Sequence, residues 1–260
     1  SLAGCFLVLR RISLLGDALS HSVLAGTAGV YLLTGRVDPV PMLCGAIAAG
    51  IVTAVLTQFV HKAALVPEDS SIGIVFTSLF AFGVVVVSQA KHVHLDLDCV
   101  LFGDLAFAGV NLHPTFGWLV PESFRSLIPT LMITLLLLAV FWKELRLTSF
   151  DPTLAVTLGF SATLMHYLLT TVVAIVTVSA MDVVGLLVVA LLIVPAAIAR
   201  LLTDRLSTML VLSCLIGVSC TTIGYLLALR WDSSAAGLSA VVAGAELLVA
   251  IVVSPKNGLL

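Results

Sequence analysis

Eight apolar runs, separated by short polar segments, constrain the fold of this chain more than any other feature. Hydrophobic residues make up 60% of the sequence and charged residues 10%, whereas a soluble domain averages about 25% charged residues. Because a helix crosses a bilayer with roughly 20 apolar residues, the sequence predicts an all-α, polytopic membrane bundle. The runs are Leu14–Leu33, Met42–Phe59, Ile72–Ser88, Leu127–Trp142, Leu164–Val178, Val183–Leu202, Met209–Leu229 and Ala235–Val253.

A shorter apolar stretch, Leu2–Leu9, opens the chain and is too short to cross a bilayer alone. We expect it to be the second part of a truncated first helix, so that the bundle has about eight to nine transmembrane helices. No internal repeat or shift of composition marks a boundary. Residues 1–260 are therefore predicted to form a single transmembrane domain.

Basic residues orient the predicted spans, because Lys and Arg are enriched in cytoplasmic loops. One set of alternate loops holds eight of them and the other set holds four. We therefore expect the richer set, and the carboxyl terminus with it, to be cytoplasmic. The richer set is Arg10, Arg11, Lys62, Lys143, Arg146, Arg200, Arg205 and Lys256, and the poorer set is Arg36, Lys91, Arg125 and Arg230.

Two ionisable residues, Asp17 and His21, lie four residues apart within the first of the eight runs. On a helix they point the same way, one turn apart. An ionisable residue inside a membrane span is costly and is by default a functional-site hypothesis. One carboxylate oxygen and one imidazole nitrogen make half of a plausible site for a divalent metal. A polar pair that packs helices together is the alternative interpretation.

Polar and apolar residues alternate in the segment Lys91–Asp98, on the predicted outer side. In an extended segment, every second side chain lies on one face. That face would offer two imidazoles and two carboxylates, from His92, His94, Asp96 and Asp98. We interpret it as an entrance strip that attracts a metal or contacts a partner. A loop with solvated side chains is the alternative, because no spacing here demands a chelate.

Residues 192–206 combine an interrupting proline with a small-residue turn and a short amphipathic segment that carries two arginines. At the cytoplasmic face, such a segment could dock into another protein. An ordinary kinked helix with a solvated end fits the residues equally well. The candidate docking residues are Pro195, Ala196, Ala197, Ala199, Arg200, Thr203, Asp204 and Arg205.

Other polar residues have simpler interpretations. Asp182, between two apolar runs, indicates a tight external turn or, alternatively, a position in the polar pathway. Glu246 lies within the last run. We expect it either to belong to a buried ion pair or to lie at the lipid interface. We expect Glu68 and Asp69 to cap a helix, since acids are favourable at helix N-termini. His61 and His166 flank cytoplasmic loops and are expected at the membrane interface.

Asp151-Pro152 predicts the start of a short helix in a cytoplasmic loop, because an N-cap residue is followed by proline at the first helical position. The helix should extend to about Leu158, with Gly159 as its stop.

Several reaction chemistries are excluded by missing motifs. The sequence has no phosphate-binding G-x-x-x-x-G-K-[ST] loop, no H-E-x-x-H and no G-x-S-x-G. Its five cysteines form no C-x-x-C pair, and its net charge of −2 does not suggest nucleic-acid binding. The chain therefore cannot hydrolyse ATP alone, and any ATP-driven process needs a separate subunit.

A series of motifs, in order along nearly the whole chain, resembles the metal-type ABC importer permeases for manganese, zinc and iron. The motifs are Arg10-Arg11, Gly16–His21, Glu68-Asp69 with Ile72–Ile74, Leu95–Gly103, Lys143–Leu145, Phe150–Pro152, Val184-Gly185, Ala190–Ala197, Ser254-Pro255 and Gly258–Leu260. Two departures are Ser22, where many relatives have alanine, and Ala25, where proline is frequent. Loss of that proline is expected to change the local kink near His21.

The resemblance implies the roles and the partners of the chain. Asp17 and His21 match the family's metal-contacting aspartate and histidine, and Pro195–Leu206 matches its ATPase-contacting segment. The chain would be a permease in the bacterial plasma (inner) membrane, a transporter subunit and not an enzyme, with no intrinsic cofactor. Its partners would be a second permease chain, identical or paralogous, two cytoplasmic ATPase subunits and an extracytoplasmic metal-binding protein.

The residues and the resemblance together predict ATP-driven import of a divalent transition metal ion. Manganese is favoured, with zinc or iron possible, and the stretch Asp96–Gly103 is most similar to the manganese/iron branch of the family. A permease for a metal chelate such as haem or a siderophore is one alternative, and it would not need Asp17 and His21. A proton-coupled secondary transporter is another, but relay carboxylates deep in several spans are limited to Asp17 and Glu246.

Overall fold

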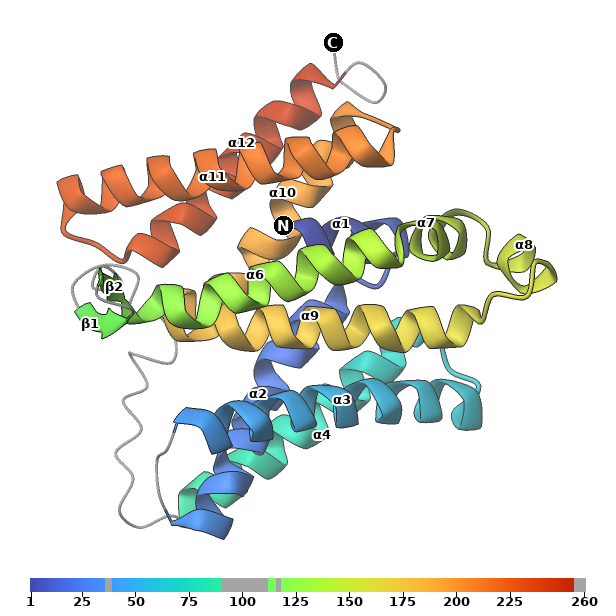
Figure 1. Ribbon diagram of the computed structural model, residues 1–260, viewed down its shortest axis with the longest axis horizontal. Helices are drawn as coiled ribbons and strands as arrows, with labels where there is room; N and C mark the ends of the chain where they lie inside the picture. The colour runs from blue at the N-terminus through green and yellow to red at the C-terminus, as the bar shows by residue number, and fades with distance from the viewer. Residues whose placement is uncertain (36–38, 90–111, 116–117, 255–260) are drawn as a thin grey trace. The chain divides into compact units, whose positions relative to one another are not determined.

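Three consecutive helices, α2 (Leu14–Thr34), α3 (Pro39–Ala64) and α4 (Glu68–Gln89), form the part of the fold that carries the predicted site. They belong to a computed structural model that describes residues 1–35, 39–89, 112–115 and 118–254 (Figure 1). The chain divides into two compact units. The α2 unit contains these three helices together with α7 (Trp142–Phe150), α8 (Pro152–Thr157) and α9 (Ala162–Val184) as far as Ser179.

The second unit, called the α11 unit, gathers segments from both ends and the middle of the chain. It contains α1 (Leu2–Leu9), strands β1 (Leu112–Thr115) and β2 (Trp118–Pro121), α6 (Glu122–Val140), the 3-10 turn η1 (Gly185–Leu187), α10 (Val188–Leu202), α11 (Leu206–Trp231) and α12 (Ala235–Val253). The two strands pair antiparallel, with Leu112 opposite Pro121. This hairpin is the one departure from the predicted all-α class among the described residues.

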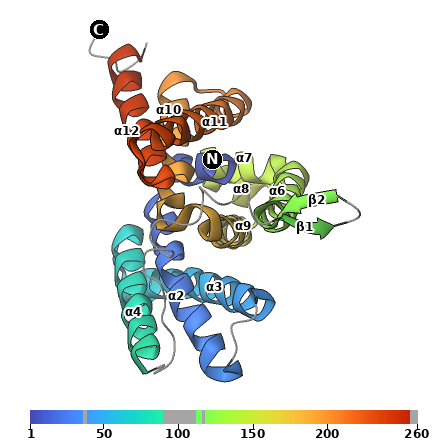
Figure 2. The same cartoon turned by 90° about the vertical axis from the view of Figure 1, so that its left-hand side faces the viewer.

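Helices α2 and α3 pack against each other (Figure 2), and the residues at their closest approach are small. A methyl group at Gly26 would clash with the backbone carbonyl of Gly45, and it would lie 2.7 Å from the Cβ of Ala49. Five residues after Gly45 on α3, a Cβ at Gly50 would lie 2.7 Å from that of Ala174 on α9. Small residues let membrane helices approach closely. These glycines therefore allow α2 to pack against α3, and α3 to pack against α9.

The connection between α3 and α4 is a tight turn. Leu65 has a φ of 53°, in the left-handed region, and its side chain is exposed. The Nδ1 of His61 contacts the carbonyl oxygen of Val66 at 2.7 Å, which satisfies a backbone group that the turn leaves without a helical partner. Glu68 and Asp69 then lie in the first turn of α4, as the sequence predicts.

The short helix α8 begins and ends where the sequence predicts. The Asp151 carboxylate accepts hydrogen bonds from the Thr153 hydroxyl at 2.6 Å and from the Leu154 N–H at 2.9 Å. These two donors lower the pKa of Asp151 below its ordinary value. Gly159, with a φ of 85°, ends the segment in a conformation that glycine adopts without strain.

The α11 unit packs around α10, which contacts α1, α11 and α12. Cys5, Ala196, Ala199 and Met209 form its fully buried core. The predicted turn after Pro195 is wrong, because α10 continues without a break to Leu202. Proline removes a single backbone donor, and the burial of Ala196 and Ala199 within the next turn favours the continuous helix.

Five helical segments of the described residues are long and apolar enough to cross a membrane, or six if the consecutive helices α6 and α7 form one broken span. They are Cys44–Ala64, Glu68–Ser88, Ala162–Met181, Leu206–Trp231 and Ala235–Val253. Six of the eight predicted runs each fall within one helix, whereas Leu127–Trp142 crosses the break between α6 and α7, and Val183–Leu202 runs from the end of α9 through η1 into α10. The number of eight to nine crossings is not confirmed. The helix α10 has 15 residues, and in α2 the residues Asp17 and His21 lower the hydropathy.

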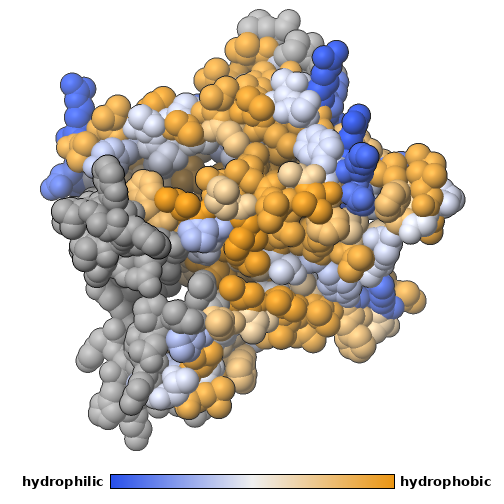
Figure 3. Space-filling view, viewed as in Figure 1, coloured by the Kyte–Doolittle hydropathy of each residue, from blue (hydrophilic) through white to orange (hydrophobic). Residues whose placement is uncertain are grey.

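The surface of the helices is apolar, as Figure 3 shows for one face. On α11, Val211, Leu215 and Val218 are 62%, 63% and 65% exposed at a spacing of four and three residues. A continuous exposed apolar stripe of this kind marks contact with lipid or with another protein, which agrees with the composition.

Candidate metal site

Asp17 and His21 lie on one face of α2, as the sequence predicts. The Asp17 Oδ1 and the His21 Nε2 are 3.5 Å apart. Their side chains remain 47% and 27% exposed, respectively, while Ala18 and Leu19 between them are buried. These apolar residues of α2 therefore pack in the core, while the Asp17 carboxylate and the His21 imidazole stay accessible.

Two phenylalanines of α4 surround the His21 ring. The ring centroid lies 5.5 Å from that of Phe76, at an interplanar angle of 33°. Its distance from the Phe80 centroid is 5.4 Å, with the rings nearly perpendicular at 77°. The imidazole thus has an apolar wall on the α4 side and a carboxylate one helical turn away on its own helix.

The separation of the two donor atoms suits a shared cation. Two ligands bound about 2.1 Å from one metal at a tetrahedral angle lie roughly 3.4 Å apart, close to the observed 3.5 Å. One oxygen and one nitrogen leave at least two coordination positions open. No three His, Cys, Asp or Glu side chains in the described part of the chain come together as a metal site. Asp17 and His21 are therefore a pair of potential ligands and not a complete site.

The residues of the predicted entrance strip, His92, His94, Asp96 and Asp98, lie outside the described residues. Asp182 does not form the predicted external turn, since α9 continues through it to Val184. The chain changes direction after α9 at Gly185, which has a φ of 67°. The left-handed conformation of this glycine, rather than the acid, is the signal for the break.

The predicted docking segment is only partly exposed. Pro195, Ala196 and Ala199 are buried within the α11 unit. Arg200, Asp204 and Arg205 are exposed, and the Arg200 guanidinium donates to the Asp204 carboxylate at 3.0 Å. Thr203 ends α10 in an extended conformation. A partner would therefore contact the end of α10 and the turn before α11, not the proline itself.

Among the described residues, Glu246 makes contacts with a hydroxyl and a thiol in place of the predicted ion pair, and its position at the lipid interface stays a prediction. Its carboxylate accepts from the Ser219 hydroxyl at 3.0 Å and lies 3.2 Å from the Cys220 sulfur, both on α11. These contacts join α12 to α11. The carboxyl group is therefore engaged by neighbouring hydroxyl and thiol donors, and the structure gives it a helix-packing role.

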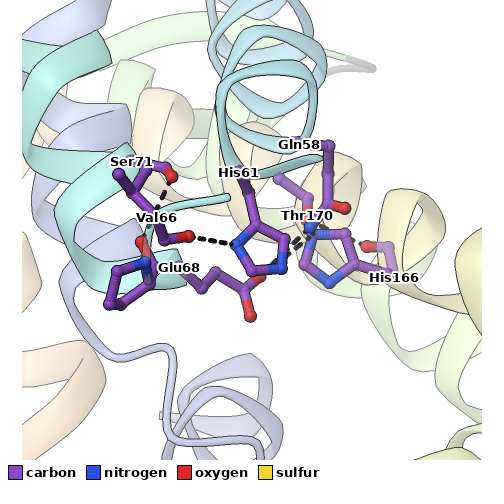
Figure 4. A network of polar contacts seen from close by, with 8 residues as sticks. Gln58, His61, Val66, Glu68, Ser71, His166 and Thr170 are labelled. Carbon is purple, nitrogen blue, oxygen red and sulfur yellow. Dashed lines mark hydrogen bonds and ion pairs between the residues drawn. The ribbon is translucent and has the colours of Figure 1, made fainter. Parts of the chain in front are cut away.

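A polar network that the sequence did not reveal connects α3, α4 and α9 (Figure 4). The Gln58 Nε2 donates to the Glu68 Oε1 at 3.1 Å and contacts the His166 Nε2 at 3.1 Å. The same Glu68 oxygen lies 3.9 Å from the His166 Nε2. The sequence predicts Glu68 at a helix start and His166 beside a cytoplasmic loop, and neither prediction indicates contact between them or with Gln58.

Removal of the bridging amide should loosen this network. We expect Gln58→Leu to lower the free energy of unfolding by about 2 kcal/mol, because one bond to a charged group and one to an imidazole are lost. Thermal unfolding of the purified protein measures the effect. Ser70→Ala, at an exposed position of α4, is the control and should leave the unfolding temperature unchanged. Equal behaviour of the two variants would show that the network does not contribute to stability.

Comparison with known proteins identifies the family. The match to the family described as "ABC 3 transport family" covers residues 1–254. The chain is 43% identical over 262 residues to the manganese transport system membrane protein MntD of Bacillus subtilis, covering 100% of this chain and 88% of the relative. It is also 43% identical over 260 residues to the zinc transport system membrane protein TroD of Treponema pallidum, covering 99% and 71%.

A solved structure of a similar protein has the same fold as this chain. A chain of PsaBC from Streptococcus pneumoniae, determined in complex with Fab, superimposes with a TM-score of 0.81 at 32% identity. The alignment covers 98% of this chain and 87% of that chain. This chain belongs to the ABC 3 transport family and is a multi-pass membrane protein.

Proposed function

We propose that this chain is the permease subunit of an ATP-driven importer that moves a divalent transition metal ion into the cytoplasm. The observation that carries the proposal is the Asp17–His21 pair, whose donor atoms lie 3.5 Å apart on a helix of an ABC transport family member. The named relatives are membrane proteins of transport systems. Hydrolysis of ATP belongs to a separate subunit, since the chain has no nucleotide-binding motif.

Manganese is the favoured ion, with zinc or iron as alternatives. An oxygen and a nitrogen ligand without thiolate suit all three ions and disfavour copper(I). Relatives named for manganese transport and for zinc transport are equally identical to this chain, at 43% each. Other relatives named for manganese, such as MntC of Halalkalibacterium halodurans at 36% identity, support the preference.

A second permease chain, identical or paralogous, completes the half site in this proposal. Asp17 and His21 from each of two chains supply up to four ligands, which fits the open coordination positions of the pair. Residues 1–260 act as one permease domain with eight or nine crossings of the bacterial plasma membrane. An extracytoplasmic metal-binding protein delivers the ion at the outer mouth, near His92–Asp98.

Two cytoplasmic ATPase subunits drive the cycle by contacting the segment that ends α10. Arg200, Asp204 and Arg205 offer both signs of charge at this exposed position. ATP binding shifts the segment and switches the pathway between outward-open and inward-open states as a rigid-body change. The ion is held loosely enough to leave, because transport requires release as well as binding.

Transport by the full complex in proteoliposomes tests the proposal. With the binding protein outside and ATP inside, we expect saturable manganese uptake that zinc and iron reduce to different extents when they compete. Uptake that needs a pH gradient instead of ATP would identify a secondary transporter. Uptake of haem or a siderophore complex, without uptake of the free ion, would identify a chelate permease. Either result would overturn the proposal.

A further inference from the structure

Phe76 and Phe80 lie on the same face of α4, four residues apart, as Asp17 and His21 do on α2. Both rings contact the His21 imidazole, at centroid distances of 5.5 and 5.4 Å. The Phe76 ring is tilted by 33° to the imidazole plane, and the Phe80 ring is nearly perpendicular to it, at 77°. The imidazole is therefore contacted from two directions by rigid side chains of a neighbouring helix.

Such contacts restrict the side-chain torsions of His21. An edge-to-face aromatic pair contributes about 0.5–1.5 kcal/mol beyond its buried area, which favours the one orientation in which both contacts form. In that orientation the Nε2 lies on the Asp17 side, 3.5 Å from Oδ1. The apolar rings also cover one side of the imidazole, and a less polar environment strengthens electrostatic interactions with a cation.

We propose that Phe76 and Phe80 are positioning residues, which hold the His21 imidazole beside Asp17 and thereby determine the affinity of the site for a divalent cation. The inference deepens the proposed function and rests on it for the transport consequences. The rings themselves supply no ligand atom. Their role is to keep the nitrogen of His21 in the place where it can share a cation with the carboxylate.

The chain offers a matched control in Phe82. It lies on α4 two residues beyond Phe80, which is roughly 200° around the helix, and it is 59% exposed. The substitutions Phe76→Leu, Phe80→Leu and Phe82→Leu remove the same ring from the same helix and keep an apolar side chain. Phe80→Tyr retains the ring, and because Phe80 is 39% exposed, its new hydroxyl can reach solvent.

Kinetics of manganese uptake by the full complex separate positioning from stability. Outer-shell substitutions at metal sites typically weaken affinity about 10–100-fold, so we expect Phe76→Leu and Phe80→Leu to raise KM at least about 10-fold, with the maximum rate within about twofold of wild type. Phe80→Tyr and Phe82→Leu should keep the wild-type KM. An unchanged KM in both leucine variants, or the same loss in Phe82→Leu, would overturn the proposal.

A second readout is independent of transport. Diethylpyrocarbonate modifies accessible imidazoles, and peptide mass spectrometry of the assembled complex measures the rate at His21 relative to His61. We expect release of the ring in Phe76→Leu and Phe80→Leu to speed modification of His21 several-fold, while Phe82→Leu has no effect. Equal rates in all variants would refute the positioning role even if Asp17 and His21 prove essential. If those two residues prove dispensable, the modification rates still decide whether the phenylalanines hold the ring.

Discussion

Asp17→Ala and His21→Ala are each expected to abolish metal uptake while leaving the assembled complex and its basal ATPase activity intact. Each substitution removes one of the two proposed ligands, whose donor atoms lie 3.5 Å apart. Loss of a ligand should exceed the about 10–100-fold effect of changing an outer-shell residue. Both side chains are partly exposed, so their removal creates no large cavity and the fold should persist.

Uptake of radioactive manganese by proteoliposomes measures this effect, with size-exclusion chromatography and ATP hydrolysis as tests of assembly. Asp69→Ala is the matched control, because Asp69 is an exposed acid in the first turn of α4, as Asp17 is an acid in the first turn of α2. The control should transport like wild type. Wild-type uptake by both Asp17→Ala and His21→Ala would remove these residues from the pathway.

The helical framework was predictable because apolar runs and turn signals are local in the sequence. Leu14–Leu33 was expected as a span and α2 covers Leu14–Thr34, and the short helix after Asp151 appears with its predicted cap. The side-by-side placement of Asp17 and His21 also followed from the 3.6-residue period alone. The family resemblance is confirmed by a match over residues 1–254.

Contacts between helices could not be predicted, because they depend on tertiary packing. Phe76 and Phe80 were ordinary members of an apolar run until the structure brought them within 5.5 Å of His21. The Gln58 network joins residues as far as 108 positions apart. Pro195 misled the prediction in the opposite direction, since burial of Ala196 and Ala199 against the α11 unit outweighs the loss of one helical hydrogen bond.

Gly26→Ala is expected to lower the free energy of unfolding strongly, although it adds only one methyl group. The added methyl group would overlap the carbonyl of Gly45 and lie 2.7 Å from the Cβ of Ala49. The nearest atom is backbone, so α2 and α3 must move apart instead of one side chain turning away. Overpacking of this kind typically costs about 1–3 kcal/mol, and we expect the upper end of that range, with lower yield and a lower unfolding temperature.

Gly29 supplies the control on the same helix. Apart from the neighbouring backbone of α2 itself, no atom of the described residues lies within 4 Å of a Cβ built at Gly29, and alanine is favoured over glycine in a helix by about 1 kcal/mol. Gly29→Ala should therefore match or exceed the wild-type unfolding temperature, in the same thermal scan in which Gly26→Ala falls. Equal stability of the two variants would mean that α2 and α3 are not in backbone contact. Because Gly26 lies five residues beyond His21 on α2, separation of the helices should also displace the ligand pair and weaken uptake.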